Sequence, residues 1–153
     1  MEPKRGFMIQ SVMGAGKSYW IKNNVPDHYK FLVIDGDELL RKLSIKNKND
    51  FWYDDTKSVE RQLIIDAFND YLNKGYWIFY SGNPNYIKTD MIILPDLGKR
   101  WIQLQGRDGY KPTHDKVMRE QLVYKNASHL CTYFINGDIP PFDVLYIIYE
   151  TLI

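Results

Sequence analysis

The stretch "SVMGAGKSYW" (Ser11–Trp20) decides the fold. It continues the apolar run "GFMIQSV" (6–12), which predicts a buried strand, and it leads into a helix expected over residues 17–24. Gly14 and Gly16 allow the backbone to turn its N–H groups inward, and the start of a helix favours an anion. A strand, a glycine-rich turn, a Gly-Lys-Ser run and a helix in this order predict a loop that binds phosphate groups.

One position departs from the usual pattern of such loops, because Ser11 stands where the pattern begins with glycine. A serine is tolerated there if its φ stays negative, and its hydroxyl can bond locally. Lys17 can bridge the outer phosphates and Ser18 can offer its hydroxyl to Mg²⁺. The residues expected to hold the nucleotide are Met13, Gly14, Ala15, Gly16, Lys17, Ser18 and Tyr19. The alternative is a glycine-rich turn that carries an exposed lysine and binds nothing.

Composition limits the classes that remain. A chain of 153 residues is long enough for one compact domain, which we expect over 1–153. Its content of 44% apolar and 15% aromatic residues excludes a largely disordered chain. A net charge of +1 gives no global positive field for nucleic acid, although a local basic groove stays open. Cys131 is the single cysteine, which predicts a buried, inert thiol in a reducing compartment. No apolar run has the length of a membrane span and "MEPKRGFMIQ" (1–10) is not a signal peptide, so we expect a cytoplasmic domain that does not enter membranes.

A second apolar run ends in two carboxylates. "KFLVIDGDE" (30–38) predicts another buried strand, with Asp35 and Asp37 at its carboxyl end. Ligands of open α/β sheets lie at that edge, and phosphoryl transfer needs both a carboxylate for the acceptor proton and Mg²⁺ near the phosphates. The alternative is a strand-end turn, in which Asp37 caps the following helix.

The remaining pattern alternates between helix and strand. A polar and aromatic loop is expected over 46–55, a helix over 55–75 and again near the end of the chain, and strands over 76–82, 90–95 and 129–137. The long helix should bury a wide apolar face that includes Val59 and Leu63. This order predicts an α/β fold of three layers, α/β/α, around a mostly parallel five-stranded sheet. Together with the glycine-rich loop, it resembles the P-loop NTPase fold. The connection over 82–89 is short for a parallel crossover, so either it is a single turn or the strand over 90–95 is misplaced.

"SVMGAGKS" followed by "IDGDELLR" resembles the P-loop kinase superfamily, in the branch that carries an acidic motif at a strand end. That branch includes adenylylsulfate, gluconate, zeta-toxin-like and polynucleotide 5′-hydroxyl kinases. The resemblance implies that Lys17 and Ser18 contact phosphate and Mg²⁺. It implies that Asp37 acts as the base toward the acceptor hydroxyl and that Asp35 is a metal or substrate neighbour. The family's acidic residue for magnesium is missing from "YSGNP" (80–84).

The resemblance also places a lid over about 96–128, where these kinases close arginines over the phosphates. Arg100, Arg107 and Arg119 are the candidates, and Arg107 between two glycines is the preferred one. Each of them is alternatively an ordinary solvated arginine. Arg41, just after the acidic motif, is a candidate for an acceptor phosphate.

Four aromatic residues are candidates for contact with the acceptor. Phe51, Trp52, Tyr53 and Tyr86 either stack on a base or simply pack in the core. We therefore predict an ATP- and Mg²⁺-dependent kinase with Lys17, Asp37 and Arg107 as catalytic residues and Ser18 and Asp35 as metal residues, acting on a nucleoside or nucleotide. A kinase for a nucleic-acid 5′ end, with a groove formed by Lys42, Lys46 and Lys48, is one alternative. A nucleotide-binding switch or NTPase without an acceptor, and a degenerate member that binds nucleotide without turnover, are the others.

Overall fold

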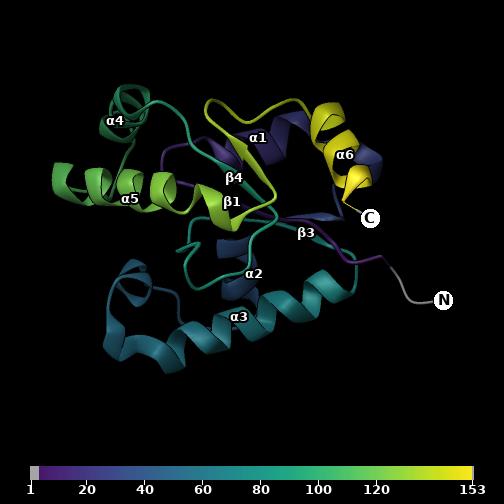
Figure 1. Ribbon diagram of the computed structural model, residues 1–153, viewed down its shortest axis with the longest axis horizontal. Helices are drawn as coiled ribbons and strands as arrows, with labels where there is room; N and C mark the ends of the chain where they lie inside the picture. The colour runs from purple at the N-terminus through teal and green to yellow at the C-terminus, as the bar shows by residue number, and fades with distance from the viewer. Residues whose placement is uncertain (1–3, 153) are drawn as a thin grey trace.

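A parallel five-stranded sheet forms the centre of the computed structural model, which describes residues 4–152 (Figure 1). Residues 1–3 and 153 of the predicted domain lie outside the described residues. The strands are β1 (Met8–Ser11), β2 (Val33–Asp35), β3 (Trp77–Tyr80), β4 (Met91–Ile93) and β5 (Tyr133–Ile135). Their order is β2-β3-β1-β4-β5, and all four neighbouring pairs are parallel. The α/β fold and the five-stranded sheet are confirmed, and the sheet is parallel throughout.

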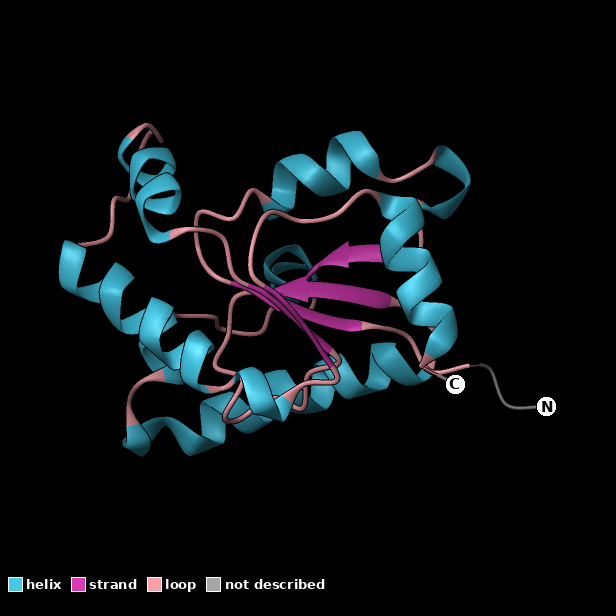
Figure 2. Ribbon diagram, turned by 45° about the horizontal axis from the view of Figure 1, so that its top comes forward, coloured by secondary structure: helices cyan, strands magenta, loops and turns pink. Residues whose placement is uncertain are grey.

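Helices cover both faces of this sheet (Figure 2). Those described are α1 (Lys17–Asn24), α2 (Gly36–Lys42), α3 (Ser58–Asn73), α4 (Leu97–Gln105), α5 (His114–Asn126) and α6 (Phe142–Thr151). Four single turns of 3₁₀ helix lie at Asp27–Tyr29, Asn49–Trp52, Asp55–Lys57 and Ser128–Leu130. Helices α1 and α6 lie on one face and α2 and α3 on the other (Figures 1 and 2). Helix α4 and the start of α5 lie toward the carboxyl ends of the strands (Figure 1), and Tyr124 near the end of α5 packs with Ile92 of β4.

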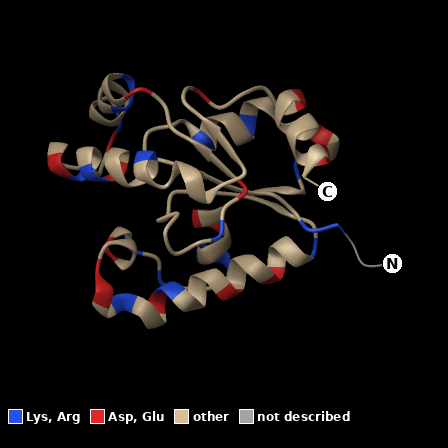
Figure 3. Ribbon diagram, in the orientation of Figure 1, with Lys and Arg blue, Asp and Glu red and all other residues tan. Residues whose placement is uncertain are grey.

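The core has two large clusters, one on each face of the sheet, because successive strand residues point to opposite faces, and a smaller third cluster contains Val12, Ile92 and Tyr124. Ile9 and Phe79 pack in one cluster with Trp20 of α1 and Leu145 of α6. The second cluster joins strand residues such as Met8 to α2 and α3 and contains Leu39, Leu40, Ile64, Phe68, Leu72 and Ile78. Asp35 is the only charged residue within the five strands, and Figure 3 shows the charges on helices and loops. The continuous apolar runs in the sequence therefore come from a sheet covered on both faces.

The short crossover is a single turn. Residues 81–90 connect β3 to β4 without a helix, and the two strands lie on opposite sides of β1. The N–H groups of Tyr86 and Ile87 both donate to the Asn83 carbonyl (2.9 and 3.2 Å), and Ile87 is buried. The Asp90 carboxylate then accepts the N–H of Met8 at 2.8 Å, which attaches the start of β4 to β1. The strand predicted over 90–95 is in place.

The predicted face of the long helix is wrong in part. Val59 and Leu63 of α3 are 71% and 56% exposed. Arg61 occupies the buried side instead, because its guanidinium donates to the carbonyls of Phe51 (3.0 Å) and Asp54 (2.6 Å). A buried polar side chain with satisfied donors displaces the apolar pattern that periodicity alone predicts.

Two further local predictions differ from the structure. The second strand begins only at Val33, because a 3₁₀ turn at Asp27–Tyr29 precedes it, and Phe31 is 68% exposed. The segment predicted as a loop over 46–55 contains a 3₁₀ turn, with Phe51 and Trp52 buried. Within residues 4–152, no helix combines the length and the apolar character needed to cross a bilayer.

Candidate active site

The glycine-rich loop between β1 and α1 has the backbone shape that the sequence predicts. Gly14 and Gly16 have φ values of 84° and 85°, in the left-handed region that favours glycine. Within residues 4–152, the N–H groups of Gly14, Gly16, Lys17 and Ser18 have no hydrogen-bond partner. The Ala15 N–H donates to the Val12 carbonyl (3.2 Å) and closes the turn. The loop and the start of α1 thus present a set of free donors suited to an anion.

Lys17 lies over this loop. Its Nζ donates to Ser81 Oγ at 2.5 Å, and Ser81 Oγ donates to the Ser11 carbonyl at 2.5 Å. Burial lowers the pKa of Lys17, while the negative charges of Asp37, Asp35 and Glu120 raise it. The lysine amine is therefore placed among carboxylates at the carboxyl end of the sheet.

Ser11 keeps the extended backbone of β1, as its replacement of glycine requires, because Ser44 is the only residue other than glycine with a positive φ in 4–152. Its hydroxyl is buried and has no hydrogen-bond partner among the described residues. The predicted local bond of this hydroxyl does not form.

Ser18, Asp35 and Asp37 lie on the side of the site formed by the start of α1 and the end of β2. Ser18 Oγ donates to Asp35 Oδ2 at 3.0 Å, and Asp35 Oδ1 accepts the N–H of Asp37 at 2.9 Å, which caps α2. Asp35, rather than Asp37, therefore caps the helix, and it is only 8% exposed. A hydroxyl beside a carboxylate is an oxygen pair that suits Mg²⁺ when phosphates supply further oxygens.

A chain of hydrogen bonds holds the exposed carboxylate of Asp37. Asn47 Nδ2 donates to Asp37 Oδ1 at 2.8 Å. Asn47 Oδ1 accepts the Tyr80 hydroxyl at 2.7 Å, and Tyr80 in turn accepts Trp52 Nε1 at 2.9 Å. Because Tyr80 and Trp52 are buried in the core, the orientation of Asp37 is set from the interior of the molecule.

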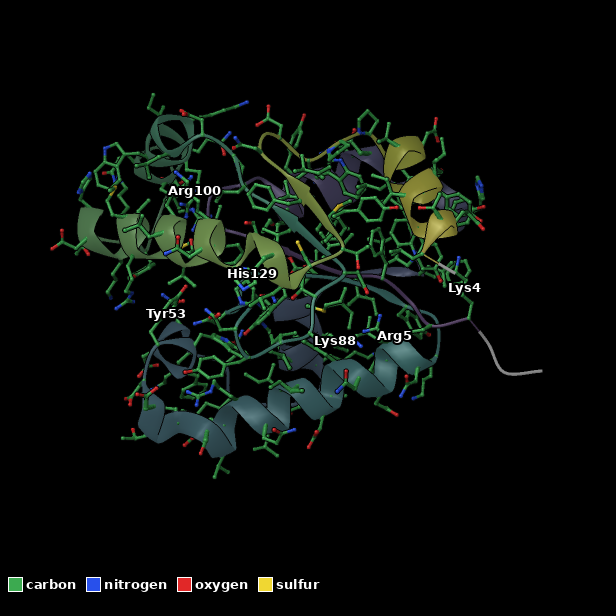
Figure 4. All side chains as sticks on the ribbon, viewed as in Figure 1. Lys4, Arg5, Tyr53, Lys88, Arg100 and His129 are labelled. Carbon is green, nitrogen blue, oxygen red and sulfur yellow. The ribbon has the colours of Figure 1, made fainter. Side chains whose placement is uncertain are left out.

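Arg100 does not face the loop from a lid. It is fully buried, and its Nε donates to the Met13 carbonyl at 3.0 Å while its guanidinium pairs with Glu120. Glu120 Oε1 also accepts the Met13 N–H at 2.9 Å. Figure 4 shows Arg100 between α4 and α5. The prediction for Arg100 is wrong, and the N–H of Met13 is bound by Glu120 in place of a phosphate.

The other arginines differ in their surroundings. Arg107 is exposed in the segment between α4 and α5, and its charge contributes to lowering the pKa of Lys17, after burial. The guanidinium carbon of Arg119 lies 4.2 Å from the centre of the Tyr53 ring. Arg41 is exposed on α2. Of these three, Arg107 is the one whose charge reaches the lysine of the loop.

A cavity of about 350 Å³ opens beside the loop. Gly16, Tyr19 and Trp20 line one side, Lys99 and Gln103 of α4 line another, and the segment from Asp138 to Pro141 closes the third. Tyr19 is 73% exposed, and Lys99 Nζ pairs with the Asp138 carboxylate at 2.5 Å, which joins two of the segments that line the cavity. The cavity suits a flat ring attached to a phosphate chain in the loop.

Of the four aromatic residues predicted as candidates for contact with an acceptor, most are engaged elsewhere. Phe51 and Trp52 pack in the core, and Arg61 covers the Tyr86 ring at 4.1 Å. Tyr53 remains at a narrow cleft that Met13, Asn49 and residues of α5 also line, and its hydroxyl has no partner within 4–152 (Figure 4). Burial raises the pKa of Tyr53 above its usual range.

Metal-binding clusters of side chains alone are absent from the part of the chain that the structure describes: no three residues of His, Cys, Asp or Glu gather there. His28 lies against Tyr29 and His114 against Trp101. Cys131 is half-buried, its Sγ lies 3.2 Å from the Ser128 carbonyl oxygen, and burial raises its pKa.

Three residues at the site are missing from the sequence prediction. Ser81 follows β3 directly, so its place at a strand end is a usable signal. Asn47 lies in an irregular polar segment, and Glu120 looks like any helical glutamate. For these two, the sequence contains no local signal, because their partners are brought to them by the fold.

Gly14 provides a test of the loop. We expect Gly14→Ala to lose about 1–2 kcal/mol from a positive φ and about 1–3 kcal/mol more from crowding, because its Cβ would lie 2.8 Å from Leu104 Cγ. Gly109→Ala is the control, since Gly109 has a φ of 81° and no atom within 4 Å of a new Cβ. Urea unfolding measures both, and equal losses would contradict the role of Leu104.

Comparison with known proteins places the fold. No protein-family model matches this chain, and no curated protein matches its sequence. A solved structure of a shikimate kinase from Bacteroides thetaiotaomicron is similar, with a TM-score of 0.60 and 14% identity over 97% of this chain and 96% of that one. A tunicamycin resistance protein from Deinococcus radiodurans has a TM-score of 0.54 and 15% identity, over 98% and 96% of the two chains. With its glycine-rich loop between β1 and α1, the chain therefore has the P-loop kinase fold.

Proposed function

We propose that this protein is an ATP-dependent kinase that transfers the γ-phosphoryl group of ATP to a hydroxyl of a small acceptor. The observation that supports it best is the grouping of Lys17, Ser18, Asp35 and Asp37 around a loop with free N–H groups. A binding loop alone explains the lysine and the serine. It does not explain an exposed carboxylate held in place by a hydrogen-bond chain from the core.

The loop binds the phosphates in this proposal. The free N–H groups of Gly14, Gly16, Lys17 and Ser18 donate to phosphate oxygens, and the positive end of α1 favours the anion. Lys17 leaves Ser81 and contacts the γ-phosphate, which replaces the carboxylates as the main source of negative charge near its amine. Ser18 and Asp35 would hold Mg²⁺ directly or through water, and the bound ion would supply positive charge opposite the phosphates.

The nucleotide base occupies the cavity beside the loop. Tyr19 offers an exposed ring for stacking at one side of that cavity. The Lys99–Asp138 ion pair joins α4 to the segment after β5 at the edge of the proposed base site.

Asp37 acts on the acceptor. The acceptor hydroxyl oxygen attacks the γ-phosphorus, its proton passes to the Asp37 carboxylate, and the bond from the γ-phosphorus to the β–γ bridging oxygen breaks. The products are ADP and the phosphorylated acceptor. Asn47 keeps one carboxylate oxygen of Asp37 engaged, so the other faces the acceptor. Arg107 approaches from the segment between α4 and α5 and stabilises the charge on the transferred group.

The acceptor is a small molecule, with a nucleoside or nucleotide as the first candidate. Tyr53 lies against the Arg119 guanidinium and is the one of the four predicted aromatic residues that lines a cleft beside the loop. A shikimate kinase from Acinetobacter baumannii, solved in complex with shikimate, has a similar fold with a TM-score of 0.50 and 14% identity over 99% of this chain and 94% of that one. Small hydroxyl-bearing acids therefore belong among the candidates as well.

A kinase for nucleic-acid 5′ ends is the second candidate. Lys42, Lys46 and Lys48 are all exposed and follow or flank the end of α2, the helix that carries Asp37. These lysines provide a short basic surface for a phosphate backbone.

A transfer assay with γ-labelled ATP tests the proposal. The acceptors are nucleosides, nucleoside monophosphates, small sugars and hydroxy acids, and 5′-hydroxyl oligonucleotides, and Lys17→Met serves as the blank. We expect label to appear on one class of small acceptor and not with the blank. Release of labelled phosphate with every acceptor and transfer to none would contradict a kinase and support the NTPase alternative.

A further inference from the structure

The Arg100–Glu120 pair lies under the phosphate loop and has no role in the transfer reaction as described so far. Arg100 belongs to α4 and is 0% exposed, and Glu120 belongs to α5 and is 4% exposed. We propose that these two residues position the phosphate loop, and that they couple its geometry to helices α4 and α5. The link to nucleotide affinity rests on the proposed function, but the effect on loop geometry does not.

Both backbone groups of one loop residue are held by the pair. Glu120 Oε1 accepts the Met13 N–H at 2.9 Å, and Arg100 Nε donates to the Met13 carbonyl at 3.0 Å. Because Met13 immediately precedes Gly14, the peptide planes that enter the turn are fixed from below. Their orientation decides where the next free N–H, that of Gly14, points.

The remaining donors of Arg100 are satisfied within the same two helices. Its guanidinium donates to Gln121 Oε1 at 2.5 Å and to the Val117 carbonyl at 3.5 Å, besides the pair with Glu120. Leu104 of α4 packs against Gly14, close enough to exclude a Cβ there. Helices α4 and α5 therefore contact the loop at two successive residues, one through polar groups and one through an apolar side chain.

The buried ion pair is not explained by a gain in folding stability alone. Removing two charges from water carries a large desolvation cost, and buried ion pairs are often replaced by apolar residues without loss of stability. Burial indeed raises the pKa of Glu120, against the opposing effects of Arg100 and the Met13 N–H. Apolar residues at these positions fill the same space but leave the two backbone groups of Met13 without partners. What the ion pair provides, and apolar residues would not, is a fixed orientation of the Met13 backbone.

The pair also reaches the catalytic lysine. The negative charge of Glu120 raises the pKa of Lys17, in the direction that keeps the amine protonated for phosphate binding. It follows that α4 and α5 are supports of the loop, held to it by buried contacts. Of the lid predicted over about 96–128, the segment over 106–113 connects the two helices and carries Arg107.

The test compares four proteins. Arg100→Met with Glu120→Leu replaces the pair with apolar residues and removes both contacts to Met13. Arg100→Lys keeps a positive charge beside Glu120 but removes the Nε donor to the Met13 carbonyl. Asp70→Ala with Lys74→Ala removes an exposed ion pair on α3, with an N–O distance of 3.2 Å, and is the control alongside wild type.

Hydrogen exchange of the Met13–Gly16 amides and melting temperature are measured without ligand, and MgATP affinity by calorimetry. We expect the double variant to keep a cooperative melting transition, to exchange the Met13 amide about tenfold faster or more, and to bind MgATP about tenfold more weakly, as the loss of one well-placed hydrogen bond implies. Arg100→Lys should change the exchange rate and the MgATP affinity in the same directions by smaller factors. The control should match wild type in both.

An unchanged exchange rate of the Met13 amide in a folded double variant would overturn the inference. If the double variant does not fold, Arg100→Lys decides: wild-type exchange and affinity in that variant would overturn it equally. If wild type itself binds no MgATP, the proposed function fails, and the exchange data still decide whether the pair positions the loop.

Discussion

Replacing Lys17 with methionine should strongly reduce phosphoryl transfer and at the same time stabilise the ligand-free protein. The loss of activity follows from removing the charge that faces the phosphates, and we expect it to be about 10²- to 10³-fold. The gain in stability follows from burial, which is the largest effect on the pKa of Lys17 and lowers it from its usual value of 10.5. A lowered lysine pKa means that the folded state disfavours the charged amine.

The pH dependence of this effect has a definite sign. Between the lowered pKa of folded Lys17 and 10.5, the unfolded chain binds more protons than the folded one, so stability rises with pH there. Below that range the cost of burying the charge is present in full. The melting temperature of Lys17→Met should therefore exceed that of wild type at neutral pH, and the difference should shrink as pH approaches 10.5.

Lys22→Met is the matched control, because Lys22 lies on the same helix and is exposed. It should leave transfer unchanged and alter the melting temperature little. A lower melting temperature for Lys17→Met at neutral pH would show that the contacts of Lys17 with Ser81 and the carboxylates outweigh its burial.

Asp37→Asn should lose transfer while binding MgATP as wild type does. Asparagine keeps the shape of the side chain but cannot accept the acceptor proton, and general-base catalysis contributes about 10²- to 10⁴-fold. Affinity for MgATP should persist, because the loop, Lys17, Ser18 and Asp35 are untouched. Radiolabel transfer and calorimetric titration with MgATP measure the two properties separately.

Glu38→Gln is the control for this variant. Glu38 is the next residue in the first turn of α2 and is exposed, so its substitution removes the same charge from the start of the same helix. It should match Asp37→Asn in stability and match wild type in transfer. If Asp37→Asn retained full hydrolysis of ATP and no acceptor were ever labelled by wild type, the switch or NTPase alternative would be favoured over a kinase.

Much of the fold is predictable because its signals are local. Gly14 and Gly16 adopt a positive φ that other residues avoid, and the apolar runs that form β1, β3 and β4 are long enough to read directly. The errors have local causes too. Val59 and Leu63 match a helical period but are exposed, because the buried side of α3 is taken by Arg61.

The site is only partly predictable. Lys17, Ser18, Asp35 and Asp37 are readable because each lies in a short motif next to a strand, and the parallel order brings those strand ends to one edge. Their supports are not readable. Asn47 holds Asp37 through a side chain in irregular structure, and nothing in its neighbourhood marks it.

The sequence by itself determined the glycine-rich loop, the acidic strand end and the alternation of strands with helices, because each depends on backbone preferences and burial patterns within a few residues. Only the tertiary structure decided which residues hold these groups in place. Lys17 meets Ser81 across 64 positions of the chain, and Met13 meets Arg100 across 87 and Glu120 across 107. Such contacts depend on the order of strands in the sheet and the packing of helices at its edge, and short-range periodicity carries no information about either.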